Sequence, residues 1–346
     1  MISLTPTAEP VRARSKGVQA PEPRWQADIK AAIRDPQVLC ERLGFPAALA
    51  QEAAAGAGQF PVFVPPAYLA KIAHGDLSDP LLRQVLPLAE EGQAVPGFIP
   101  DPVGDLAVEE APGLLHKYQG RVLLITTGAC AVHCRYCFRR HYPYETAPHS
   151  DAAWDEAIEA IQSDRAIREV ILSGGDPLML VDERLLSLIA RIEAIDHVKR
   201  LRIHTRLPIM IPSRVTKGLL ECVAQSRLQT IIVLHVNHAQ ELDGETANAA
   251  EKLRAVRAVL LNQAVLLRGV NDSVEAQCDL SEQLIQQGVT PYYLHQLDRV
   301  AGAAHFEVSE DRGREIITEL RQRLPGYLVP RYVKEEAGET SKQVLL

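Results

Sequence analysis

Three cysteines, Cys130, Cys134 and Cys137, lie within eight consecutive residues and are spaced C-x3-C-x2-C. They follow an apolar run, residues 122–125, that has the character of a buried strand. A four-iron cluster is usually held by four thiolates, so three thiolates leave one iron open to a small molecule. The alternatives are a zinc site, with His133 as a further ligand, or scattered core cysteines. Three of the six cysteines in so short a stretch argue against chance clustering.

The composition is typical of a globular protein, with 47% hydrophobic and 23% charged residues in 346. The net charge of −7 gives no sign of a nucleic-acid partner. No apolar run approaches the length of a membrane span, and the N-terminus lacks a signal-peptide pattern. Because the cysteines are too few for a disulfide framework, we expect a reducing cytoplasmic environment, which an oxygen-sensitive cluster would need.

The pattern along the chain predicts four regions. Residues 1–22 form a loosely ordered arm, 23–105 a helical region ending in a Pro/Gly-rich linker at 95–102, 106–300 an α/β barrel and 301–346 a short C-terminal segment. Strands are expected at 122–126, 169–173, 200–204, 230–235, 264–267 and 291–295, and helices between them, for example at 151–164 and 182–195. Six strand–helix alternations indicate a parallel sheet, which fits a partial (β/α)6 TIM-like barrel.

The element SGGDPL, residues 173–178, follows the second of these strands. Two glycines allow the backbone to approach a ligand closely, although Gly-Gly-Asp-Pro is also ordinary turn chemistry. A Gly-Gly-Asp element that follows a three-cysteine motif in this order resembles the radical S-adenosylmethionine (SAM) enzymes. The resemblance implies that Cys130, Cys134 and Cys137 hold a [4Fe-4S] cluster, and that Gly174, Gly175 and Asp176 form the element that binds the amino group of SAM.

Further strings narrow the resemblance. CFRR at 137–140, HTRLP at 204–208, HVNH at 235–238, NQAVLLRGVND at 262–272 and PYYLHQLD at 291–298 occur in order. From about residue 114 onward, the chain resembles the lysine 2,3-aminomutase family of radical SAM enzymes. These isomerases use SAM, the cluster and pyridoxal 5′-phosphate (PLP) to move an amino group from the α to the β carbon.

The resemblance implies roles for the residues that would bind PLP. Lys342, after the small-residue run 337–341, matches the lysine to which PLP attaches. Lys117, Tyr118 and Arg121 match the family's phosphate-binding residues. A lone lysine near a terminus is otherwise most often a solvated charge, and basic residues beside a strand are usually solvated too.

The resemblance also implies how the substrate is held. Arg139 matches the arginine that pairs with the substrate carboxylate, a task suited to its planar fork. Asp298 matches an aspartate that holds the distal ammonium of lysine, and Glu335 stands where the family has a second aspartate. Tyr136 is expected near the adenine of SAM, and Arg206, His235 and Gln263 near SAM or the PLP ring. His235 and Gln263 could equally be satisfied polar groups of the core.

Two departures from the family pattern bear on the family's zinc site and on the branch of the family that the chain resembles. Ser273 and the absence of a cysteine-bearing tail remove the family's zinc site, so we expect no structural zinc. The short tail and Glu335 resemble the bacterial branch that makes β-lysine for the modification of elongation factor P. The expected partners are therefore L-lysine, an electron donor such as flavodoxin, and elongation factor P with its lysyl ligase.

Three alternatives remain open from the sequence. One is a free-lysine 2,3-aminomutase of catabolism or antibiotic synthesis, the second a radical SAM enzyme without PLP, and the third a non-enzymatic zinc-binding module.

Overall fold

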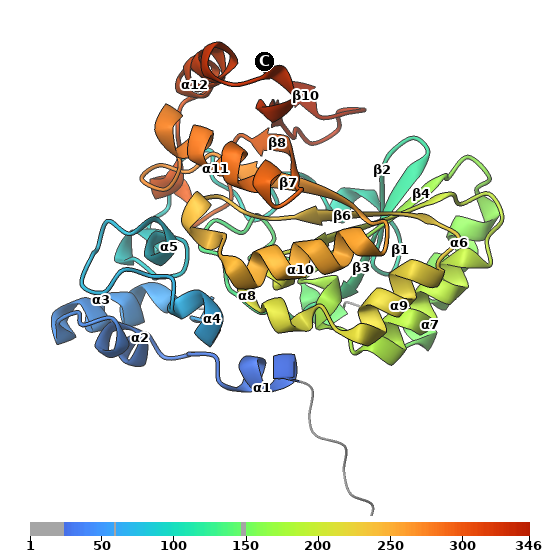
Figure 1. The fold of residues 1–346 in the computed structure, drawn as a ribbon, viewed down its shortest axis with the longest axis horizontal. Helices are drawn as coiled ribbons and strands as arrows, with labels where there is room; N and C mark the ends of the chain where they lie inside the picture. Colours follow the sequence, from blue (N-terminus) through green and yellow to red (C-terminus); the bar gives the residue numbers. More distant parts are fainter. Residues whose placement is uncertain (1–23, 59, 147–149) are drawn as a thin grey trace, which may run out of the picture.

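The computed structural model describes residues 24–58, 60–146 and 150–346 (Figure 1). The predicted N-terminal arm at residues 1–22 lies outside the described residues. Among the described helices, none is both long and apolar enough to cross a membrane.

A single twisted sheet forms the centre of the described part of the chain, with its strands ordered β1 to β10 as in the sequence (Figure 1). Adjacent strands from β3 to β9 pair in parallel: β3 Arg121–Thr127, β4 Glu169–Gly174, β5 Arg200–Thr205, β6 Gln229–Leu234, β7 Val259–Val265, β8 Thr290–His295 and β9 Arg331–Lys334. The antiparallel strands β1 Glu109–Ala111, β2 Leu114–Tyr118 and β10 Gln343–Val344 extend this run at its two sides. The parallel strands therefore all end at the same edge, where barrel enzymes place their chemistry.

Helices connect the parallel strands because each crossover must return the chain to the other end of the sheet. They are α6 Asp155–Ser163, α7 Asp182–Glu193, α8 Leu207–Met210, α9 Lys217–Gln225, α10 Gly244–Ala255, α11 Val274–Gln286 and α12 Glu310–Arg323. In α7 the buried residues Leu185, Leu188, Ile189 and Ile192 recur at helical spacing, so one face of the helix packs on the core. Strand β4 is buried along its whole length, as expected for a strand covered on both faces.

In the region before the sheet, the described residues form the short α-helices α1 Arg24–Lys30, α2 Pro36–Arg42, α3 Ala47–Ala57, α4 Pro66–Leu69 and α5 Pro80–Arg83. Asp35 and Asp79 cap α2 and α5 through their carboxylates, and each is followed by a proline in the first helical turn. These helices lie to one side of the sheet in Figure 1.

The α/β barrel class predicted from the sequence is confirmed, and five of the six predicted strands match to within one residue at each end. The exception is β7, expected at 264–267 and observed at Val259–Val265. Its polar residues Asn262 and Gln263 interrupt the apolar pattern, although Asn262 is satisfied by the backbone of Val236. The last parallel strand, β9, is an addition to the predicted set, since its four residues are too few to show a periodicity.

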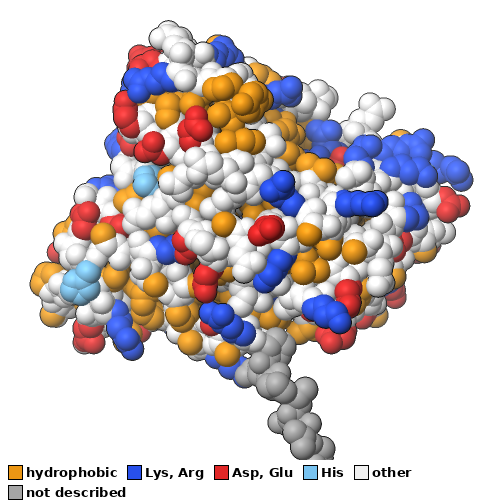
Figure 2. Space-filling model, viewed as in Figure 1, with side chains coloured by type: hydrophobic (Ala, Val, Ile, Leu, Met, Phe, Trp, Pro, Cys, Tyr) orange, Lys and Arg blue, Asp and Glu red, His pale blue; other side chains and the backbone are white. Residues whose placement is uncertain are grey.

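Charged side chains are interspersed over the face shown in Figure 2, with Lys and Arg gathered near the region of β4 and α6.

Candidate active site

A cavity of about 690 Å³ is lined by residues of the strands of the sheet and of the loops that follow them. This volume is in the upper part of the range for small-molecule sites. All of the site residues predicted from the sequence line this one cavity: Lys117, Tyr118, Arg121, Cys130, Cys134, Tyr136, Cys137, Arg139, Gly174, Gly175, Asp176, Arg206, His235, Gln263, Asp298, Glu335 and Lys342. Residues separated by more than 200 positions in the sequence are thus brought together, while their individual roles stay predictions.

The three cysteines lie on the loop that follows β3, and each has a free, partly buried thiol. Burial and the neighbouring sulfur of Cys134 raise the pKa of Cys137 to about 11, and burial also raises the pKa of Cys130. Sulfurs so placed become stable thiolates only when a bound metal supplies positive charge. The donor set therefore fits a cluster held by three thiolates.

Gly174, the last residue of β4, and Gly175 bring the loop that follows this strand against the cysteine loop. Gly175 donates its N–H to the Thr127 carbonyl, and Asp176 donates to the Ala129 carbonyl, both at 2.8 Å. A Cβ on Gly175 would lie 2.3 Å from the Ala129 oxygen, so no other residue fits there without displacing the loop. Gly174 has φ of +122°, a conformation that favours glycine. The sequence pointed to a close approach to a ligand, and the structure shows a close approach to the backbone that carries the cysteines.

Asp176 is buried and does not face the cavity with free oxygens. Its carboxylate accepts hydrogen bonds from the Thr205 hydroxyl and from the backbone N–H groups of Arg206, Leu207 and Leu178. Burial outweighs these bonds and raises its pKa to about 6. The carboxylate thereby ties the loop after β4 to the end of β5.

Arg206 lies directly beside the cysteine loop. Its Nη1 donates to Cys134 Sγ at 2.8 Å, and its Nη2 donates to Gln84 Oε1 at 2.6 Å and to Glu241 Oε2 at 2.8 Å. Glu241 is fully buried and neutralises the guanidinium. A hydrogen bond to a cluster sulfur is one of the means by which a protein adjusts a cluster's reduction potential.

Tyr136 and His235 form a pair behind the cysteines. Their rings are stacked with centroids 5.6 Å apart, and the Tyr136 hydroxyl lies 2.9 Å from His235 Nε2. Burial, aided by the Arg206 cation, lowers the pKa of His235 to about 3, so the imidazole is neutral. Asn237 donates to the same hydroxyl at 2.7 Å, which fixes the ring of Tyr136.

Lys342 lies just before β10, and its Nζ is ion-paired with Glu335. Glu335 also accepts from Lys117 at 3.0 Å. Burial acts to raise the pKa of Glu335, but the Lys342 and Lys117 cations outweigh it and hold that pKa well below its ordinary value. The carboxylate is therefore charged at every pH at which the protein is expected to work.

Arg139 is buried, and two of its three guanidinium nitrogens donate to protein groups. Its Nε donates to Asp105 Oδ2 at 2.7 Å, and its Nη1 donates to the Ser173 hydroxyl at 3.1 Å. A guanidinium carries five N–H donors, so further donors remain for a ligand carboxylate.

Asp298 follows β8 and is partly buried. Burial and the nearby Glu335 raise its pKa to about 7, and within the described part of the chain its carboxylate has no hydrogen bond or ion pair. A carboxyl of this kind is suited to receiving a cation from a ligand.

Arg121, at the start of β3, has its guanidinium 4.6 Å from the ring of Tyr118. Among residues 24–58, 60–146 and 150–346, it forms no ion pair with a carboxylate. An uncompensated guanidinium facing a cavity fits an anion such as a phosphate. Together with Lys342, these residues fit the binding of PLP.

Three further residues that line the cavity, His204, His295 and Asp105, were not predicted as site residues from the sequence. His204 and His295, at the ends of β5 and β8, have buried Nε2 atoms without a hydrogen-bond partner. Both occur in the family strings, and that was the available signal. Asp105 joins two cations of the site, but it lies in a loop that shows no motif.

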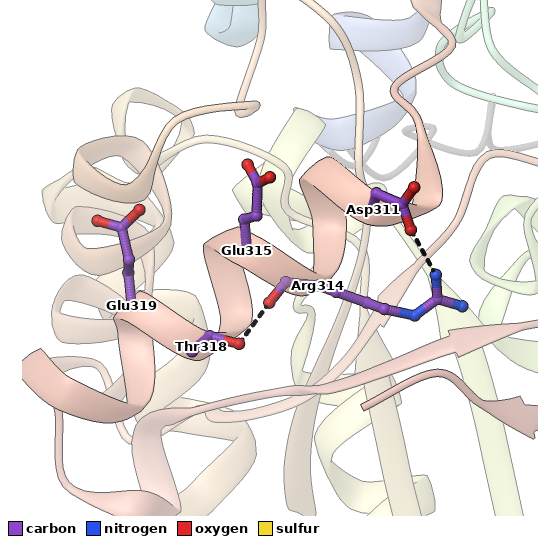
Figure 3. Close-up of a pocket in the computed structure, with 5 residues that line it drawn as sticks. All are labelled: Asp311, Arg314, Glu315, Thr318 and Glu319. Atoms are coloured by element: carbon purple, nitrogen blue, oxygen red, sulfur yellow. Dashed lines mark hydrogen bonds and ion pairs between the residues drawn. The ribbon is translucent and has the colours of Figure 1, made fainter.

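A second depression, of about 390 Å³, lies on the outer face of α12 (Figure 3). Asp311, Glu315 and Thr318 are exposed there, and Arg314 pairs with Asp311 at 3.0 Å within the same helix. Such i,i+3 pairs are typical of a solvated helix surface, so this depression carries no functional assignment.

Comparison with known proteins agrees with this geometry. Residues 124–276 match the model of the radical SAM superfamily. The chain is 46% identical over 322 residues to the L-lysine 2,3-aminomutase of Escherichia coli K12, covering 93% of this chain and 94% of that protein. It is 44% identical over 321 residues to the enzyme of the same name from Haemophilus influenzae, covering 93% and 95%. For that of Clostridium subterminale the identity is 36% over 284 residues, covering 81% and 67%.

The fold and the three-cysteine loop thus define a radical SAM enzyme, with a [4Fe-4S] cluster and SAM as the cofactors of its class. The chain belongs to the lysine 2,3-aminomutase family, and it is an isomerase. This membership removes the alternative of a non-enzymatic zinc-binding module.

Proposed function

We propose that this enzyme converts L-lysine to β-lysine with PLP as an additional cofactor, and that its product serves the modification of elongation factor P. One observation carries the first part: the cysteine loop, Lys342 and the unpaired Asp298 line the same cavity. A cluster, a lysine for PLP and a carboxylate for a second ammonium would thereby reach one substrate.

Arg139 and Asp298 define the substrate class. The remaining donors of the Arg139 guanidinium would bind the α-carboxylate, and Asp298 would pair with the distal ammonium. A substrate with a carboxylate at its far end, such as glutamate, would meet like charge from Asp298 and Glu335. The residues favour a basic amino acid.

The cofactors supply the chemistry that side chains lack: a reduced cluster with SAM provides a carbon radical that removes a hydrogen atom, and PLP provides a π system that lets the nitrogen migrate. The protein contributes binding and shielding. Lys342 would hold PLP covalently, Lys117, Tyr118 and Arg121 would hold its phosphate, and the cavity walls would exclude water from the reacting centre.

The elongation factor P role rests on Glu335 and on the relatives. The chain is 46% and 44% identical to the proteins of E. coli and H. influenzae, and 36% identical to that of C. subterminale. This pattern supports the branch that the sequence resembles. An electron donor such as flavodoxin and a cytoplasmic location belong to the same proposal.

Anaerobic incubation with L-lysine, SAM, PLP and dithionite, followed by chiral product analysis, tests the reaction. β-Lysine is the expected product, and its absence would refute the proposal. Absorbance of the protein-bound PLP in the same sample separates this enzyme from a radical SAM enzyme without PLP.

A second experiment tests the role of the product. Elongation factor P is expressed with its lysyl ligase and either this enzyme or its Cys137→Ala variant, and the intact mass is measured. A β-lysyl adduct only with the unmodified enzyme is expected. Formation of β-lysine without any such adduct would instead support the alternative, a free-lysine aminomutase of catabolism or antibiotic synthesis.

A further inference from the structure

Asp105 lies at the junction of the two cationic groups that would bind the substrate carboxylate and the PLP phosphate. Its Oδ2 accepts from Arg139 Nε and its Oδ1 is ion-paired with Lys117 Nζ, both at 2.7 Å. The residue is only 2% exposed. Burial acts to raise the pKa of Asp105, but the two cations outweigh it and keep the carboxylate charged.

The loop that carries Asp105 is itself held in place. The Asp101 carboxylate accepts from the backbone N–H groups of Asp105 and Leu106 at 3.0 and 3.1 Å. Lys117 also donates to the Val103 carbonyl at 2.9 Å. The carboxylate of Asp105 is thus fixed from its own loop as well as from its ligands.

The same loop packs against the segment between Glu335 and Lys342. Gly104 has φ of +67°, and a Cβ there would lie 3.1 Å from the Ala337 Cβ. Ion pairs also connect β2 to the segment between Glu335 and Lys342, because Lys117 pairs with Glu335 and Glu335 pairs with Lys342. A chain of alternating charges therefore runs from Arg139 through Asp105, Lys117 and Glu335 to Lys342.

We infer that Asp105 is a positioning residue that orients Arg139 toward the substrate carboxylate and keeps Lys117 from competing for it. By occupying the Nε side of Arg139, Asp105 turns the remaining donors of the guanidinium to the cavity. Without this carboxylate, no negative charge would stand between Arg139 and Lys117, and Lys117 would keep only Glu335 as a carboxylate partner among the described residues. This inference rests on the proposed function, since it assigns the carboxylate of lysine to Arg139.

The test compares two ligands that differ in the relevant group. L-Lysine and cadaverine share the distal ammonium and the aliphatic chain, but cadaverine lacks the carboxylate. Calorimetric titration of the reconstituted, oxidised enzyme with each ligand measures the two affinities without turnover. Asp105→Asn keeps the shape of the side chain and removes its charge.

Asp105→Asn is expected to weaken lysine binding by about tenfold or more, because the buried ion pair between Arg139 and the lysine carboxylate would lose its geometry. Cadaverine binding is expected to change by roughly twofold at most. Iron content and SAM cleavage by dithionite in the absence of lysine should match those of the unmodified enzyme. Glu110→Gln is the matched control, because Glu110 is exposed, lies five residues away and pairs only with His116 among the described residues.

An equal loss of affinity for lysine and cadaverine would indicate general damage to the cavity and would overturn the inference. Unchanged lysine affinity would overturn it too. If the Asn variant does not retain its cluster, Asp105→Glu serves instead. Its longer arm keeps the charge but does not place the carboxylate 2.7 Å from both cations, so the same selective loss is expected. Failure of the unmodified enzyme to bind L-lysine would count against the proposed function rather than against Asp105.

Discussion

Replacing Asp298 with Asn should change both lysine binding and its dependence on pH. The pKa of Asp298 in the ligand-free protein is raised to about 7, and pairing with the lysine ammonium requires the ionised form. At pH 6 only about one tenth of the carboxyl is ionised, so the apparent affinity should be about tenfold weaker than its limit at high pH. The asparagine variant should bind lysine more weakly by roughly 2–5 kcal/mol at pH 8 and show no such pH dependence.

The charged and imidazole groups around Asp298 and Lys342 do not titrate in this window. Glu335 is held ionised by Lys342 and Lys117, and burial lowers the pKa of His204 and His295 well below the ordinary value. Calorimetric lysine titrations at pH 6, 7 and 8, in buffers of different ionisation enthalpy, measure both the affinity and the proton release. Equal lysine affinity at pH 6 and pH 8 would refute the reasoning.

The same pKa has an opposite consequence for stability. Between pH 3.8 and about 7 the folded protein binds more protons at Asp298 than the unfolded chain, so stability falls as the pH rises. The difference of about three units corresponds to a cost of up to ~4 kcal/mol above pH 7. Ligand-free Asp298→Asn should therefore unfold at a higher temperature than the unmodified protein at pH 8, and the gain should disappear toward pH 4. A lower unfolding temperature at pH 8 would contradict this origin of the pKa.

Further predictions concern the cofactors and the substrate carboxylate. Changing Cys130, Cys134 or Cys137 singly to Ala should abolish reductive SAM cleavage and most bound iron; a normal four-iron cluster in all three variants would exclude these ligands. Lys342→Ala should lose the absorbance of covalently held PLP while part of the dithionite-driven SAM cleavage persists, and borohydride labelling of another lysine would show that the assignment is wrong. Arg139→Lys should lower kcat/KM for lysine by about tenfold or more, because an ammonium does not reproduce the planar fork; unchanged kinetics would rule out its contact with the carboxylate.

The residues that could be predicted from the sequence belong to local patterns. Cys130, Cys134 and Cys137 follow an apolar strand, and the glycines after β4 occupy a turn, so short segments were sufficient to locate them. The carboxylate of Asp105 is different, because its importance comes from Lys117 on β2 and Arg139 on the cysteine loop, which reach it from other parts of the chain. No spacing pattern in the sequence indicates that these three side chains contact one another.

Strand boundaries show the same limit. In β7, Asn262 looks like the end of an apolar run, yet it is buried because the Val236 backbone satisfies it. Similarly, β9 is only Arg331–Lys334, and it becomes a strand because β8 offers it a parallel edge. In both cases the extent of the strand depends on a neighbouring segment of the folded protein, and the local sequence does not show which segment that is.

The alternating charges between Arg139 and Lys342 also bear on how ligands leave the enzyme. Lys342, Lys117 and Arg139 each have a carboxylate partner within the protein, so a substrate anion would bind to charges that are already partly neutralised. The net affinity would then be smaller than bare cations would give. Substrate and product, which carry the same charged groups, would both be held loosely enough to turn over, while the arrangement of partners still selects where each group binds.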